Sequence, residues 1–220
     1  MTSFPHSPRT LKGGIVLLDP DTFNVMPNGV LVLQYTPETL KRTLKAKGAE
    51  EGGDRSEAMR LTGPPVETIT LDAEIDATDQ LEFPDRNPDA VRLGIFPQLA
   101  ALESLLYPSS ATLQSNFNLA QTGSLEIMPV MAPLALFVWS SNRILPVRIT
   151  DFSVTEEAFD PLLNPTRAKL SLGLRVLSID DLPFADKGGS LYMVYHQQKE
   201  RLAALQPGGS LGALGIRGPI

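Results

Sequence analysis

The chain has 220 residues, a net charge of -6 and no cysteine. This length can bury a large core without disulfides or metal ions, and the missing cysteines exclude disulfides, zinc–thiolate sites and a cysteine nucleophile. The negative charge argues against a general nucleic-acid-binding protein, and no stretch approaches the roughly 18 apolar residues that a membrane-spanning helix needs. We therefore expect no nucleic-acid partner and no direct membrane insertion.

Two apolar runs near the amino terminus, residues 15–18 and 30–35, predict the first two strands. Asp19-Pro20 and Asn28-Gly29 lie between them and favour turns, so the runs are expected to form a hairpin with a long connection. Residues 45–65 carry four glycines, two prolines and many charges. That composition predicts an exposed, mobile loop.

Residues 66–76 alternate between apolar and polar side chains, which predicts a strand with one buried and one wet face. The period then changes, because apolar residues recur at helical spacing over residues 93–107. Pro97 fits the first turn of a helix, so one helix packed across the sheet is expected. Pro108 ends that helix, and the polar residues 109–124 are expected to be a connection.

The most strongly patterned stretch, residues 133–183, predicts three successive antiparallel strands. Residues 134–139 are an unbroken apolar run, which favours a strand covered on both faces. Residues 145–150 alternate and the apolar parity then switches, which indicates a β-bulge near Asp151. Residues 168–176 give the clearest period of two. Residues 156–165 contain two turn-forming pairs, Asp160-Pro161 and Asn164-Pro165, and are expected to be a long loop.

The carboxyl-terminal part is predicted to hold a second helix, because several apolar residues lie on or near one face of residues 191–205. Residues 207–220 carry five glycines and two prolines and are expected to be disordered or to order only on a partner. The residues alone thus predict a mainly β (α+β) fold. Residues 1–183 form its β domain, and residues 184–220 form a helix and a glycine-rich tail.

An acidic group on the strand 66–76 could have a chemical role. Asp72, Glu74 and Asp76 share one face of that strand, and with Asp79 they could form a calcium site or a glycosidase carboxylate pair. Alternating acids on an amphipathic strand are more often its wet face, and the spacing of an EF-hand loop is absent. The solvated face is therefore the favoured interpretation.

The motifs of known catalytic and cofactor sites are absent or out of context. The two histidines, His6 and His196, lie far apart, which leaves no histidine metal cluster. Residues 208–212 match G-x-S-x-G around Ser210, but no strand precedes the serine and no histidine follows it. There is no P-loop and no dinucleotide-binding pattern. The residues predict no catalytic, cofactor or metal site and hence a protein that is not an enzyme.

Two further groups of side chains have both a functional and an ordinary explanation. Lys41, Arg42, Lys45 and Lys47 form a basic cluster, which is a binding patch or, more commonly, a solvated run of charges. Trp139 with Phe137 could stack on a sugar or a base, but aromatic residues within an apolar strand are more often core or inter-subunit contacts.

Several long stretches resemble the tube-domain family of contractile injection systems, the phage-tail-like machines. They are LVLQYTPETL at residues 31–40, Pro64-Pro65 with the strand that follows, GIFPQLAALESLLY at residues 94–107, and above all residues 136–182. The likeness covers most of residues 11–183 and is strongest to the tube-initiator or inner-baseplate protein. Relatives of that protein often carry a LysM module, but here only a helix and a tail follow Asp181, so peptidoglycan binding is not carried over.

The resemblance implies an antiparallel tube-protein β-barrel or β-sandwich with one packed helix, which assembles as a homo-hexamer. Such a ring would template polymerisation of the inner tube and link it to spike, baseplate and sheath components. The loop 45–65 would order between subunits or layers. The candidate inter-subunit contacts are Lys45, Lys47, Arg55, Arg60, Arg143, Glu156, Asp160 and Asn164. Assembly is expected in the cytoplasm, within a phage-tail-like particle that is then released or anchored at a membrane such as the thylakoid.

Two alternatives stay open. The chain could belong to another layer of the inner tube or be a tube-forming subunit. A function of a different class is a carbohydrate-binding β-sandwich that uses Trp139 and the acidic strand.

Overall fold

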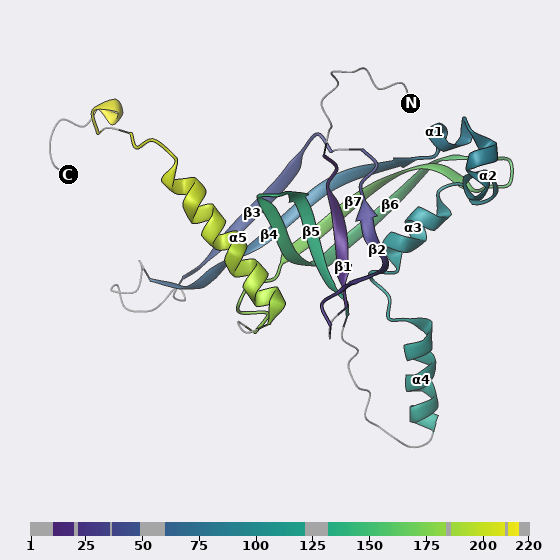
Figure 1. Cartoon of the computed structure of the whole chain (residues 1–220), viewed down its shortest axis with the longest axis horizontal. Helices are drawn as coiled ribbons and strands as arrows, with labels where there is room; N and C mark the ends of the chain where they lie inside the picture. The colour runs from purple at the N-terminus through teal and green to yellow at the C-terminus, as the bar shows by residue number, and fades with distance from the viewer. Residues whose placement is uncertain are drawn as a thin grey trace.

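The computed structural model describes residues 11–19, 22–35, 37–48, 60–121, 132–183, 186–209 and 211–215. These residues contain one seven-stranded antiparallel sheet in the order β2-β1-β5-β6-β7-β4-β3 (Figure 1). The strands are β1 (Gly14–Leu18), β2 (Val25–Val32), β3 (Leu40–Gly48), β4 (Leu61–Asp76), β5 (Leu134–Ser140), β6 (Arg143–Phe159) and β7 (Pro165–Val176). The predicted mainly β, α+β class is confirmed.

The helices connect and flank the strands. They are α1 (Thr78–Leu81), α2 (Pro88–Leu93), α3 (Phe96–Glu103), α4 (Ser110–Gln121) and α5 (Lys187–Ala204), with 3-10 turns η2 (Pro84–Arg86) and η3 (Leu211–Leu214). None of the helices in the described ranges is long and apolar enough to cross a membrane.

The three central strands form as their sequence predicts. β5 pairs with β6, and β6 pairs with β7. Because side chains alternate along a strand, the apolar run of β5 supplies two cores. Ala135 and Phe137 belong to the main core, while Leu134 and Leu136 belong to a smaller cluster with Leu18. The prediction that this strand is covered on both faces is confirmed for β5.

The expected bulge near Asp151 is present. The register of β6 against β7 shifts between Ile149 and Asp151, which moves Phe152 and Val154 onto the core side. Gly173 lies opposite, and a Cβ atom there would come within 2.7 Å of Asp151 Oδ2 and 2.9 Å of Asp151 Cβ. The glycine thus leaves room for the bulge.

The prediction of a loop over residues 45–65 is wrong at both of its ends. Residues 45–48 complete β3, and residues 61–65 begin β4, so the two strands form a long hairpin; residues 49–59 lie outside the described residues. The sequence LKRTLKAKG of β3 has too little apolar alternation to be recognised as a strand. Pairing with β4 from Leu40 to Gly48 nevertheless supplies its backbone hydrogen bonds.

The prediction of a single helix over residues 93–107 is also wrong, because Gly94 interrupts the helical backbone. This residue has φ 56°, and a Cβ atom there would come within 2.1 Å of the Pro165 carbonyl oxygen. The next N–H, of Ile95, donates to that same oxygen at 2.8 Å. The contact with β7 separates α2 from α3, which then buries Leu99 and Leu102 as expected.

Two other segments differ from their predictions. Residues 110–121 of the expected polar connection form the helix α4, which buries none of its side chains. The loop expected over residues 156–165 is shorter, because β6 continues to Phe159 and β7 begins at Pro165. The second predicted helix is confirmed as α5, and its Tyr192 and Tyr195 lie in the main core.

The sheet curls without closing. The side chain of Gln34, just after β2, makes two hydrogen bonds to the backbone of Asp76 at the end of β4. Gln34 Nε2 donates to the Asp76 carbonyl at 2.6 Å, and Gln34 Oε1 accepts from the Asp76 N–H at 2.9 Å. This side chain therefore connects the end of β2 to the end of β4. The strand order nevertheless has two ends, β2 and β3. Within the described residues the architecture is therefore one open, curled sheet, neither a closed barrel nor a two-sheet sandwich.

Candidate functional site

The two edge strands are the first candidate surfaces. Within the ranges that the structure describes, β2 pairs only with β1 and β3 only with β4. An edge strand presents one row of unpaired N–H and C=O groups, which can pair with a strand of another molecule. The two edges lie at opposite ends of the strand order and differ in chemistry.

The β3 edge is cationic. Lys41, Arg42, Lys45 and Lys47 all lie on this strand, so the predicted basic cluster is one edge of the sheet. Lys47 Nζ lies 2.6 Å from Asp180 Oδ2, whereas Lys45 is exposed. Of the other predicted contacts nearby, Arg60 is exposed just before β4, and Arg55 lies outside the described residues.

A buried carboxylate ties this hairpin to α5. Glu67 on β4 is 3% exposed and accepts from Arg42 Nη2 at 2.5 Å and from Lys199 Nζ at 3.0 Å. Tyr195 adds its hydroxyl, which accepts from Arg42 at 3.0 Å, and its ring lies 4.1 Å from the Lys199 ammonium. Burial works against the charge of Arg42, but hydrogen bonding and attraction to Glu67 outweigh it and raise the pKa of the guanidinium.

The β2 edge is uncharged and interrupted. Asn28 has φ 56°, and the register with β1 passes from Val16 opposite Val30 to Leu18 opposite Val25, so Asn28 and Gly29 form an irregularity within β2 and not the expected turn. Beyond it, Val30 and Val32 are more than half exposed. The regular, accessible part of this edge is therefore short and apolar.

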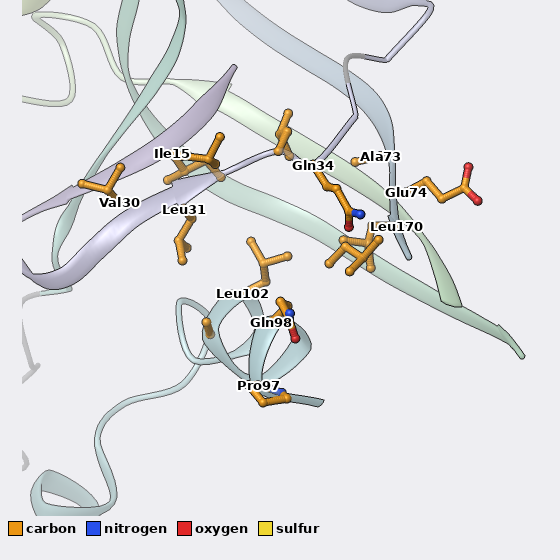
Figure 2. A pocket seen from close by; sticks show the side chains of 14 residues that line it. Ile15, Val30, Leu31, Gln34, Ala73, Glu74, Pro97, Gln98, Leu102 and Leu170 are labelled. Carbon is orange, nitrogen blue, oxygen red and sulfur yellow. The ribbon is translucent and has the colours of Figure 1, made fainter. Parts of the chain in front are cut away.

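An apolar groove lies beside the β2 edge. This β2–α3 groove has a volume of about 410 Å³ and is lined by Val30, Leu31 and Leu33 on one side and by Pro97, Ala101 and Leu102 on the other. Leu31 from the strand and Leu102 from the helix point toward one another (Figure 2). Gln98 also lines it, and its Oε1 is the one buried side-chain nitrogen or oxygen atom without a hydrogen-bond partner among the described residues.

The turn between β6 and β7 is the third candidate surface. Asp160 Oδ1 accepts from the N–H groups of Leu162 at 2.7 Å and Asn164 at 2.8 Å, and Asp160 Oδ2 accepts from Asn164 Nδ2 at 2.7 Å. These bonds, that from the Asn164 side chain first, lower the pKa of Asp160. Asn164 Nδ2 also donates to the Arg92 carbonyl at 3.1 Å, which ties the turn to α2.

This rigid turn displays apolar side chains. Leu162 and Leu163 are 79% and 77% exposed, and Phe159 is half exposed. Leu163 has φ 64°, an unfavourable conformation for a residue with a branched side chain, and it is held by its N–H bond to the Asp160 carbonyl at 3.0 Å. We call Phe159, Leu162 and Leu163 the β6–β7 knob.

The predicted contact residues do not form one cluster. Lys45, Lys47 and Arg60 lie at the β3–β4 end, whereas Glu156, Asp160 and Asn164 lie toward the β6–β7 end, at the opposite end of the long axis (Figure 1). Arg143 begins β6, next to Asn142, whose side chain accepts from Gln198 of α5 at 2.8 Å. The predicted contact residues thus lie at three separate places: the basic β3–β4 hairpin, the turn between β6 and β7, and the start of β6 beside α5.

Sequence reasoning missed three features. Glu67 occupies a core position in the alternation of β4, and a charge at such a position signals a buried ion pair. The sequence gives no signal for the role of Gln34, because its hydrogen-bond partner is the backbone of Asp76, 42 residues away. The consecutive leucines after Asp160-Pro161 are a visible signal, because apolar side chains in a tight turn cannot reach the core of their own sheet.

The other chemical candidates are not brought together. Asp72 and Glu74 lie on the side of β4 that faces away from the core. Trp139 stacks on Phe137, with 5.7 Å between the ring centroids, and packs against the main core. His196 faces Glu200 at 3.4 Å, and Ser210 lies outside the described residues. No group of three or more His, Cys, Asp or Glu side chains that could hold a metal ion occurs in the described part of the chain.

No protein-family model matches the chain, and no curated protein matches it.

Proposed function

We propose that this protein is a structural subunit that assembles into a ring by pairing the β3 edge of one copy with the β2 edge of the next. The observation that carries the proposal is the open sheet with two unlike edges. A head-to-tail contact between different surfaces closes into a ring when its rotation permits, and a closed ring leaves no free edge.

The chemistry of the edges favours this pairing over its alternatives. Two β3 edges would bring Lys41, Lys45 and Lys47 of one copy against the same side chains of another, and like charges on facing strands are destabilising. Two β2 edges would pair over the same short stretch beyond Asn28-Gly29 and would leave both β3 edges unpaired. Pairing β3 with β2 avoids the repulsion.

The proposed biological setting is a contractile injection system, because most of residues 11–183 resemble its tube-domain family. In that setting the ring is a hexamer in the inner baseplate that starts the inner tube and contacts the spike, the tube and the sheath or baseplate proteins. Another tube layer is the second candidate. A carbohydrate-binding role has less support, because Trp139 and the acidic residues of β4 do not meet.

A single substitution can block the β2 edge without breaking β2 from β1. The Leu33 N–H donates to the Gly13 carbonyl at 2.9 Å, and in an antiparallel pair the N–H groups of alternate residues point the same way. With Ile15 opposite Leu31, the N–H groups of Val30 and Val32 therefore point away from β1. Val32→Pro removes one of these outward donors.

The experiment compares the full chain, Val32→Pro and the matched control Val32→Thr by electron microscopy and light scattering, alone and with the candidate tube protein. Rings are expected from the unchanged chain and from Val32→Thr but not from Val32→Pro. The Val32→Pro variant should keep the circular dichroism spectrum of a folded sheet. A protein that stays monomeric at high concentration and with its partner would contradict the proposal.

A further inference from the structure

Edge pairing leaves several exposed apolar features of the described residues unused. Two of them are the β6–β7 knob and the β2–α3 groove. Isolated exposed apolar residues need no explanation, but a rigid apolar projection and a preformed apolar hollow on one chain do.

The knob is held so that its leucines cannot fold back. The three hydrogen bonds to the Asp160 carboxylate fix the turn, and the Asn164 bond to Arg92 fixes it against α2. With Leu162 and Leu163 both more than three-quarters exposed, the knob is not seated in the groove of its own chain.

The groove is lined mainly by apolar side chains, with Gln34, Glu74 and Gln98 as its polar members. It lies between β2, whose Leu31 packs against the main core, and α3, whose Leu99 and Leu102 belong to that core. Ala101 contributes only a methyl group to its wall, which leaves the space open, and Leu31 and Leu102 present apolar surface from both sides (Figure 2).

We propose that the β6–β7 knob of one copy inserts into the β2–α3 groove of a second copy. Both halves of this contact are on the same chain and at different places, so it is a head-to-tail contact, of the kind that builds rings or stacks. The groove borders the β2 edge, so the knob adds a side-chain contact beside the strand pairing. The inference rests on the proposed function in one respect, namely that copies of the chain assemble.

The test uses the absence of natural cysteines. Leu162→Cys and Ala101→Cys are made separately in the full chain, mixed at assembling concentration and treated with a short bismaleimide cross-linker. Each protein then has one reactive thiol. The expected result is a covalent dimer in the mixture at a yield several-fold above that of either variant alone. Leu205→Cys, which is as exposed as Leu163 but lies at the carboxyl-terminal cap of α5, replaces Leu162→Cys as the matched control and should give only the background yield.

A second pair of variants measures the energy of the contact. Leu162→Asp with Leu163→Asn makes the knob polar while asparagine tolerates the positive φ, and Ala101→Trp fills the groove. Each is expected to weaken self-association by about tenfold or more, because burial of a leucine contributes about that factor. Combining the knob and groove changes should cost little more than either alone.

The outcomes separate this inference from the proposed function. Rings that form normally, with no excess cross-linking between residues 162 and 101, overturn the knob contact and leave the ring proposal standing. Cross-linking with unchanged particles in Val32→Pro supports the knob contact and contradicts edge pairing. Additive effects of the knob and groove variants would also overturn the inference, because the two changes would then act at separate contacts.

Discussion

At the scale of single residues, Glu67 holds α5 against the β3–β4 hairpin. Its carboxylate is buried between Arg42 and Lys199, so Glu67→Gln leaves two cations without their counter-charge. We expect the free energy of unfolding to fall by about 1–3 kcal/mol, since both cations retain some access to water. Asp72→Asn, an exposed position on the same strand, should change it by less than about 0.5 kcal/mol. Urea denaturation measures both, and equal effects would contradict the assignment.

Asp160 makes the β6–β7 knob sensitive to acid. Its pKa is lowered in the folded protein, so the stabilisation is fully present above the ordinary carboxyl value of about 3.9 and is lost as the pH falls through the lower folded value. The amide signals of Leu162 and Asn164 should therefore titrate together with a midpoint below 3.9 in nuclear magnetic resonance spectra. The same signals should not titrate in Asp160→Asn. A midpoint at or above 3.9 would show that the carboxylate does not hold the turn.

At the scale of elements, the junction of α2, α3 and β7 depends on Gly94. Any Cβ atom there meets the Pro165 carbonyl oxygen, and the backbone has φ 56° and ψ -130°, which side chains disfavour. Gly94→Ala is expected to destabilise the protein by about 2–4 kcal/mol and to lower its melting temperature. Gly208→Ala, where nothing lies within 4 Å of the added atom, is the matched control. An unchanged melting temperature in Gly94→Ala would contradict this packing.

The elements that sequence reasoning predicted are those whose own pattern decides their structure. β5, β7 and the bulge of β6 follow from apolar periodicity alone. β3 was missed because its lysines interrupt the pattern, and its strand form depends on β4, its hydrogen-bonding partner. The break between α2 and α3 depends on Pro165, some 70 residues away, and α4 has no buried face for a periodicity to reveal.

At the scale of the whole molecule, the candidate surfaces were predicted only in part. Lys45 and Lys47 were expected to lie in a loop, but they lie on an edge strand, where in the proposed ring their charges would select the partner edge. Asp160 and Asn164 support the turn that displays Leu162 and Leu163, and their contact with a neighbouring subunit stays a prediction. Which strands form the edges depends on the full strand order, and no local pattern in the sequence contains that order.

The central claim is that the β2 edge is paired in the assembled protein. Amide hydrogen exchange at Val30, Leu31 and Val32, resolved residue by residue in the monomer and in the assembly, tests it most directly. Leu31 lies opposite Ile15 with its N–H toward β1 and serves as the internal control, protected in both states. The amides of Val30 and Val32 should exchange quickly in the monomer and become protected on assembly. Fast exchange at Val30 and Val32 in assembled particles would contradict the claim.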